Sequence, residues 1–187
     1  MHIIGGQFRK QKLQSPKGEQ TRPTKNILRE TFFNICMPYI EDAIFVDLFA
    51  GSGAMGLEAL SRGAKHSYFI EAHKNACTAI EKNIKLLKVE KSATLIRGDV
   101  FQKLKSIIHM CDIIFADPPY AKKDQTSYAV ILLEFLNKYA FLKEGGRLYI
   151  EIGSSEKIDF SFYKSFEIIK ERSIGSSRLI EMKQLNL

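Results

Sequence analysis

Apolar runs alternate with helical patterns through most of this chain. Five short runs rich in β-branched, aromatic and leucine residues have the length of buried strands, at residues 44–48, 67–70, 93–97, 112–116 and 147–152. Between them, apolar residues recur at helical spacing over 76–87 and 131–139. Parallel neighbours need crossover connections, so this alternation predicts an α/β fold with a mostly parallel sheet and helices on both faces.

The beginning of the chain departs from this pattern. Glycines and prolines interrupt the first 23 residues, which predicts a small β-hairpin appendage rather than a helix. A helical pattern follows, with Thr24 as its expected cap and Pro38 near its end. We therefore expect an appendage over residues 1–23 and one main domain over residues 24–187.

The end of the chain also has its own pattern. Apolar runs at residues 166–171 and 178–183 flank the sequence IGSS. Two such runs around a glycine-containing turn predict an antiparallel hairpin, which would close one edge of the sheet.

The composition excludes several classes of protein. A hydrophobic content of 45% and a charged content of 26% are typical of a globular protein that is neither disordered nor embedded in a membrane. No apolar run approaches the ~18 residues of a membrane span, so we expect no membrane partner and a cytoplasmic location. The three widely spaced cysteines predict buried, reduced thiols, and the four histidines form no metal-binding spacing, so no metal site is expected.

The positive charge is concentrated at the N-terminus. Residues 1–29 contain seven basic side chains and one acid, a net charge of +6, whereas the remaining 158 residues contain 21 bases and 20 acids. Binding of such a segment to a polyanion releases counterions and gains affinity, so the excess indicates a docking surface for nucleic acid. A solvated basic arm without a partner is the alternative interpretation.

A glycine-rich loop follows the first predicted strand. In DLFAGSGAMG, Gly51, Gly53 and Gly56 satisfy the pattern GxGxxG, which by itself indicates a dinucleotide site. Asp47 stands four residues before the first glycine, where its carboxylate would oppose the two negative charges of a dinucleotide. A cofactor with a positive ammonium group and no phosphate fits better, and S-adenosylmethionine is such a cofactor.

The next two strands also end in acids. Glu71 lies 20 residues after Gly51, a spacing that suits an acceptor for ribose hydroxyls, and Asp99 of the sequence RGDV could accept from an adenine amino group. Together with Asp47, these acids predict a ligand site along the carboxyl edge of the sheet. The alternative is that each acid only caps the helix that follows it.

The fourth strand leads into Asp117, Pro118, Pro119 and Tyr120, the sequence DPPY. Asp117 and the backbone carbonyl of Pro118 could accept the two hydrogens of an exocyclic amino group, because proline fixes its own φ and restricts the residue before it. Tyr120 could stack on a base that has left its helix. A structural turn with Asp117 as a cap is the alternative.

The order of DLFAGSGAMG, FIEA, GDV and DPPY resembles the S-adenosylmethionine-dependent amino methyltransferases, which have a Rossmann-like class I fold. More narrowly, the N-terminal sequences HIIGGQFRKQKL and TRPTKNILRETFFNI resemble the RsmD family, which methylates the 2-amino group of a guanine in 16S ribosomal RNA. The resemblance implies a small ribosomal subunit, partly or fully assembled, as the partner of a monomeric enzyme.

The resemblance also assigns roles to residues of this chain. It implies catalysis by Asp117, Pro118, Pro119 and Tyr120, cofactor binding by Asp47, Gly51, Gly53, Glu71, Asp99 and Val100, and RNA binding by Arg9, Lys10, Lys12, Arg22 and Thr24. His73 stands where many relatives carry an acid, so it departs from the family pattern. The alternatives are an amino methyltransferase that acts on DNA or another RNA and a non-catalytic RNA-binding assembly factor. A nicotinamide-dependent dehydrogenase fits Asp47 and DPPY less well.

Overall fold

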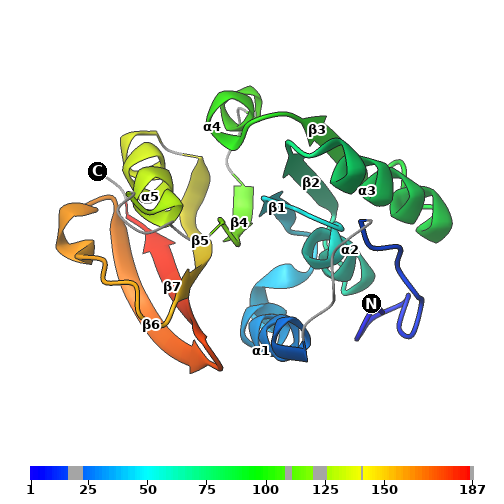
Figure 1. The fold of residues 1–187 in the computed structure, drawn as a ribbon, viewed down its shortest axis with the longest axis horizontal. Helices are drawn as coiled ribbons and strands as arrows, with labels where there is room; N and C mark the ends of the chain where they lie inside the picture. The colour runs from blue at the N-terminus through cyan, green and yellow to red at the C-terminus, as the bar shows by residue number, and fades with distance from the viewer. Residues whose placement is uncertain (17–22, 108–110, 120–125, 140, 186–187) are drawn as a thin grey trace.

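The computed structural model describes residues 1–16, 23–107, 111–119, 126–139 and 141–185. Its elements are α1 (Pro23–Ile40), β1 (Ile44–Leu48), α2 (Ala54–Ser61), β2 (His66–Glu71), α3 (Lys74–Leu87), β3 (Ala93–Arg97), α4 (Val100–Lys103), η1 (Leu104–Ser106), β4 (Cys111–Ala116), α5 (Tyr128–Lys138), β5 (Leu142–Gly153), η2 (Phe160–Phe162), β6 (Phe166–Ile174) and β7 (Ser177–Gln184). Figure 1 shows their arrangement.

The strands form one sheet in the order β3-β2-β1-β4-β5-β7-β6. The first five strands pair in parallel, and β7 pairs antiparallel with both β5 and β6. The expected mostly parallel sheet with a C-terminal antiparallel hairpin is therefore confirmed. The chain order reverses between β1 and β4, and open α/β sheets bind ligands beyond the carboxyl ends of strands at such a point.

One face of the sheet is covered by α1, α2, α3 and the N-terminal segment. Phe32 of α1 makes edge contacts with Phe115 of β4 and Tyr149 of β5, at centroid distances of 5.0 and 4.9 Å. Ile3 and Leu13 of the N-terminal segment are buried in the same core. Burial of apolar surface stabilises the folded state by about 25 cal/mol per Å². The hydrophobic effect therefore attaches this segment to the sheet, as it does the helices.

The opposite face is covered by α4 and α5. Val100 and Leu104 pack there with Leu132 and Leu133 of α5 against the other side of the same strands. Successive side chains of a strand point to opposite faces of the sheet. Because helices cover both faces of the inner strands, nearly every side chain of these strands is buried, and their sequences are continuously apolar. In Figure 1 the two groups of helices lie on opposite sides of the sheet, as the sequence predicts.

The first helix differs slightly from the expectation. It begins at Pro23, so Thr24 lies inside its first turn rather than before it. Proline suits the first position of a helix because its missing N–H would have no helical partner there. Pro38 lies inside the last turn, two residues before the helix ends.

Candidate functional site

The glycine loop between β1 and α2 is built from unusual backbone conformations. Gly51 and Gly53 have φ values of 55° and 77°, which L side chains rarely adopt. Gly56 has a different role, because a Cβ there would lie 2.3 Å from the ring of Phe69 in β2. The three glycines of the motif thus allow a tight turn and a close approach of α2 to the sheet.

Asp47 stabilises the junction between this loop and α2. Its Oδ2 accepts a hydrogen bond of 2.9 Å from the backbone N–H of Gly56, in the first turn of α2. The carboxyl is buried, and this burial raises its pKa well above the usual value for aspartate. The hydrogen bond from Gly56 opposes that shift, and the charges of Asp117 and Glu71 add to it. Asp47 therefore both caps a helix and belongs to an anionic cluster.

Glu71 connects the glycine loop to the start of α3. Its Oε2 accepts from the N–H of Gly51 and its Oε1 from the N–H of His73, both at 2.7 Å. The side chain is buried at the end of β2, one residue beyond the level of Leu48 in β1. His73 thus contributes through its backbone, which any residue at this position could do.

Asp99 occupies a different position from the other two acids. It is exposed, and its Oδ1 accepts from the N–H groups of Phe101 and Gln102 as the N-cap of α4. The alternative of a helix cap therefore describes the observed contacts of Asp99. The side chain of Val100 is buried in the second core, so its backbone amide is the group that could reach a ligand.

The DPPY sequence begins directly beyond β4. Ala116 pairs with Leu48 of β1 and with Ile150 of β5, so Asp117 follows in the middle of the carboxyl edge. Pro118 is buried and Pro119 is exposed. Tyr120 lies outside the described residues.

Asp47, Glu71 and Asp117 form what we call the carboxylate cluster. They lie on adjacent strands, and alternation with the core residues Phe69 and Phe115 places all three on the face covered by α1 and α2. Their charges interact strongly enough to shift the pKa of Asp47. A set of carboxylates around a glycine loop fits a cationic ligand and opposes a pyrophosphate.

The predicted RNA-binding residues lie on and near the N-terminal hairpin. An antiparallel bridge joins His2 to Lys12, and Arg9, Lys10 and Lys12 are exposed. Arg22 lies outside the described residues, and Thr24 is the second residue of α1.

Arg29 departs from the role suggested by the basic N-terminal segment. It is buried, and its guanidinium donates to the backbone oxygen of His2 at 2.6 Å. Its pKa is lowered by burial and raised in part by Glu58. Arg29 therefore supports the hairpin from inside the molecule and is not part of an exposed docking surface.

Comparison with known proteins places this chain in a family. The model of the family described as "Conserved hypothetical protein 95" matches residues 1–183. The chain belongs to this family. "Ribosomal RNA small subunit methyltransferase D" of Haemophilus influenzae is 32% identical over 178 residues, which cover 94% of this chain and 89% of the relative. The resemblance to the RsmD family is thereby confirmed.

Solved structures of members of this fold class agree. The yhhF protein of Escherichia coli superposes with a TM-score of 0.85 at 29% identity, covering 100% of this chain and 99% of that one. The SMU.776 protein, solved in complex with SAH, has a TM-score of 0.69 at 14% identity, covering 87% of this chain and 50% of that one. The Rossmann-like methyltransferase fold is confirmed, and the second likeness concerns the fold alone.

Two residues with unusual features, Glu151 and Phe49, were not predicted from the sequence. Glu151 is a buried acid one residue beyond Ile150, the partner of Ala116, and its Oε1 accepts from the hydroxyl of Ser177 at 2.6 Å. Phe49 adopts a φ of 59°, a left-handed conformation that is rare for a residue with a side chain. An acid at the end of the fifth strand was visible in the sequence, but only the strand order places it beside Asp117.

Neither a metal centre nor a membrane-spanning helix is found among the described residues. No group of three or more histidine, cysteine, aspartate or glutamate side chains among them could hold a metal ion. Within the same part of the chain, no helix is long and apolar enough to cross a membrane. Cys36, Cys77 and Cys111 are buried, and burial raises the pKa of the Cys36 and Cys111 thiols to about 12.

Proposed function

We propose that this protein is an S-adenosylmethionine-dependent methyltransferase that modifies the exocyclic 2-amino group of a guanine in 16S ribosomal RNA. The observation that carries the proposal is the carboxylate cluster, which surrounds the glycine loop and includes the first residue of the DPPY sequence. Membership of the RsmD family and the name of the Haemophilus relative support the substrate.

The residues present fit the cofactor. Burial and neighbouring carboxylates penalise the negative charge of Asp47, and a cationic ligand nearby would relieve that penalty. We assign cofactor binding to the loop of Gly51 and Gly53, to Asp47 and Glu71, and to Asp99 with the backbone of Val100. When bound, S-adenosylmethionine supplies an activated methyl group on a positive sulfur. SAH, its demethylated product, is the ligand in the related fold of SMU.776.

The chain's own residues would orient the amine. The lone pair of a guanine amino nitrogen is delocalised into the ring, so it attacks poorly unless both amino hydrogens are accepted by the protein. We assign one hydrogen to the carboxylate of Asp117 and the other to the backbone carbonyl of Pro118, which the second proline helps to fix. Pro119 and Tyr120 complete this proposed clamp, with the tyrosine ring stacked on the extruded base.

Asp117 is better suited to orientation than to removing a proton. A carboxylate is a feeble base for a neutral aromatic amine, which gives up a proton far less readily than a carboxylic acid does. Alignment of the reacting atoms can contribute up to roughly 7–11 kcal/mol, whereas one hydrogen bond to a charged group contributes about 1.5–3 kcal/mol. After methylation the nitrogen is acidic, and its proton can then leave to the carboxylate or to water.

We assign RNA docking to the N-terminal residues 1–23, and methyl transfer to residues 24–187. The exposed side chains of Arg9, Lys10 and Lys12 would meet phosphates, and we assign the same role to Arg22 and Thr24. The proposed substrate is a partly or fully assembled small ribosomal subunit in the cytoplasm, and the enzyme acts as a monomer.

The decisive experiment supplies labelled S-adenosylmethionine with three substrates in parallel. These are small subunits that lack the modification, naked 16S ribosomal RNA and DNA. We expect label in the small-subunit RNA, recovered as N2-methylguanosine after digestion. Methyladenine, or label in DNA alone, would overturn the substrate assignment and favour the alternative of a DNA or different RNA methyltransferase.

A further inference from the structure

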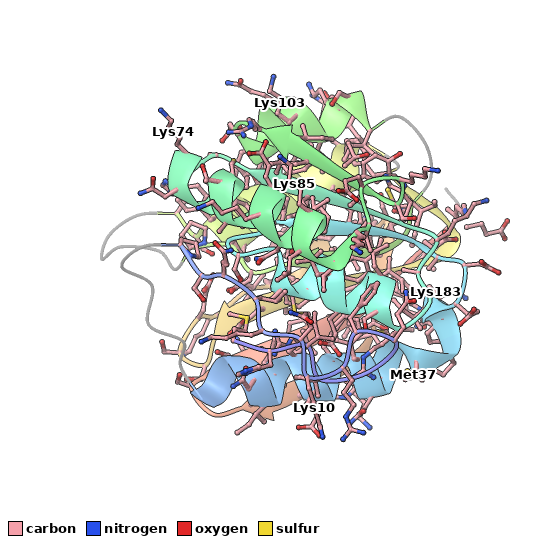
Figure 2. The ribbon with its side chains drawn as sticks, turned by 90° about the vertical axis from the view of Figure 1, so that its right-hand side faces the viewer. Lys10, Met37, Lys74, Lys85, Lys103 and Lys183 are labelled. Atoms are coloured by element: carbon pink, nitrogen blue, oxygen red, sulfur yellow. The ribbon has the colours of Figure 1, made fainter. Side chains whose placement is uncertain are left out.

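A groove runs between the N-terminal hairpin and α3. It has a volume of about 680 Å³, and residues 11–16 line one side while α3 lines the other. On α3 the lining residues Asn75, Thr78 and Lys82 are three and four positions apart, which places them on one face of the helix. Figure 2 shows α3 and the hairpin, with Lys85 and Lys10 labelled, on the face of the molecule that is turned towards the viewer.

The walls of this α3 groove are held together by a buried asparagine. Asn83 of α3 accepts from the N–H of Gln14 at 2.8 Å and donates to the backbone oxygen of Gln14 at 2.9 Å. The same amide donates to the backbone oxygen of Ser52 in the glycine loop at 3.1 Å. Leu13 is buried beside this contact. The groove is therefore formed before any ligand arrives, which lowers the entropic cost of binding.

The lining of the groove suits an anionic polymer with exposed bases. Lys12 from the hairpin and Lys82 from α3 both line it, and none of the described residues that line it is acidic. Amide and hydroxyl groups lie between the lysines, and Leu86 adds an apolar surface that is 44% exposed. A positively charged groove that follows the phosphate backbone is one feature of single-stranded nucleic-acid channels, and here amide, hydroxyl and apolar side chains are placed to contact the bases.

One end of the groove lies near the proposed reaction site. Asn75 lies four residues after Glu71, so this end of the groove opens at the carboxyl edge of the sheet. From Asn75 to Leu86, the α3 side extends over about 16 Å at the rise of an α-helix. Asn83 links the groove physically to the glycine loop through Ser52.

We propose that the α3 groove binds a single RNA strand that adjoins the target guanine. This inference rests on the proposed function and adds a second RNA contact to the hairpin, with Lys82 as its phosphate-binding residue on α3. Lys82 differs from the other lysines of α3 because it shares a groove with the basic hairpin.

The first test compares two neutralised lysines of the same helix. Lys82→Gln removes the charge that lines the groove, whereas Lys85→Gln removes an exposed charge three residues further on that does not line it. For Lys82→Gln we expect a higher KM for RNA and a slope of log K against log salt that is smaller by about one, with the affinity for S-adenosylmethionine unchanged. Equal effects of the two substitutions on the salt slope would overturn the groove assignment.

The second test identifies the occupant directly. A photoreactive benzophenone amino acid replaces Thr78 in the groove or, as the control, Lys85, and each variant is irradiated with unmodified small subunits. We expect a crosslink to 16S ribosomal RNA near the methylated guanine from position 78 only. A crosslink to a ribosomal protein, or none, would overturn the proposal. Methyl transfer is measured on the same preparations, so a wild-type enzyme without transfer would instead contradict the proposed function.

Discussion

Asp47 has two roles that make opposite demands on its charge. As an acceptor for the N–H of Gly56 it is stabilised in the ionised form, yet burial and the charges of Asp117 and Glu71 favour the protonated form. Burial prevails, because the pKa of Asp47 is raised well above its usual value. A charge that the fold itself destabilises is typical of binding and catalytic sites.

Asp47→Asn should make the free energy of unfolding less dependent on pH. Because the folded pKa is raised, the folded chain binds more protons than the unfolded chain between about pH 4 and the folded pKa. The contribution of Asp47 to stability is therefore fully present below about pH 4 and is lost as the pH rises through the folded pKa. Asparagine cannot ionise and still accepts from Gly56.

Urea unfolding of both proteins between pH 4 and pH 8 measures this difference. The D47N variant should gain stability relative to the parent as the pH rises. Asp159→Asn is the control: hydrogen bonds from Ser161 lower the pKa of Asp159, so its contribution to stability is lost only below about pH 4 and its difference from the parent should stay constant between about pH 4 and pH 8. A constant difference between parent and D47N across the pH range would contradict the prediction.

Asp117→Ala should reduce kcat while the affinity for S-adenosylmethionine changes little. The variant loses one hydrogen bond to a charged acceptor, which corresponds to roughly 10- to 150-fold in rate at about 1.5–3 kcal/mol. Asp112→Ala is the matched control at the opposite end of β4, where the carboxylate pairs with Lys143 at 2.8 Å. Single-turnover transfer to small subunits measures both. Unchanged turnover in D117A would contradict the role of Asp117, whereas normal subunit assembly by D117A without any methyl transfer by the parent protein would favour a non-catalytic assembly factor.

At the scale of elements, the N-terminal hairpin is joined to α2 by a buried carboxylate. Glu58 is fully buried and accepts from the N–H groups of Ile4 and Gly5, each at 2.7 Å. Its Oε1 also accepts from Arg62 at 2.9 Å. The hairpin that carries Arg9, Lys10 and Lys12 is thus fixed to the helix that follows the glycine loop. RNA docked on the hairpin would have a defined position relative to the cofactor site.

Glu58→Gln should destabilise the fold by about 3 kcal/mol or more, because it leaves a buried arginine and backbone donors without their charged acceptor. Glu81→Gln is the control, since its ion pair with Arg97 is about half exposed on both sides and solvent screening leaves such a pair little effect on stability. Urea unfolding measures both losses. Similar losses in the two variants would show that Glu58 is not the main attachment of the hairpin.

At the scale of the whole molecule, the basic side chains of the hairpin and the proposed reaction site lie on different parts of the protein. The hairpin bears the exposed side chains of Arg9, Lys10 and Lys12, whereas the carboxyl edge bears the carboxylate cluster. A polyanion therefore meets the hairpin more favourably than the cluster, and only a base that has left its stack can approach the acids with its amino edge.

Neutralising Arg9, Lys10 and Lys12 together should weaken RNA binding and reduce its salt slope by about three. The affinity for S-adenosylmethionine should stay the same, because these side chains are exposed on the hairpin. Neutralising Lys157, Lys164 and Lys170, which are exposed in the C-terminal part of the chain, is the control for net charge. Filter binding at several salt concentrations gives both slopes, and an unchanged slope in the hairpin variant would contradict its docking role.

The strands and the glycine loop were predictable because their signals are local. Apolar runs placed β1 within its observed bounds and β4 to within one residue, and the glycine motif placed a loop directly after β1, where Gly51 and Gly53 have positive φ. The three acids could not be told apart in this way. Asp47 and Glu71 bind backbone N–H groups around the loop, whereas Asp99 caps α4 at the exposed end of β3.

The sequence alone determined the fold class, the family and the type of chemistry, because periodicity, the glycine spacing and DPPY are contained in short stretches of chain. Tertiary structure decided which charges act together. Glu151 lies beside Asp117 only because β5 pairs with β4, and Arg29 is internal only because the hairpin packs over α1 and α2. The α3 groove likewise exists because Asn83 joins segments 69 residues apart. Contacts between distant segments depend on packing, which short-range patterns do not encode.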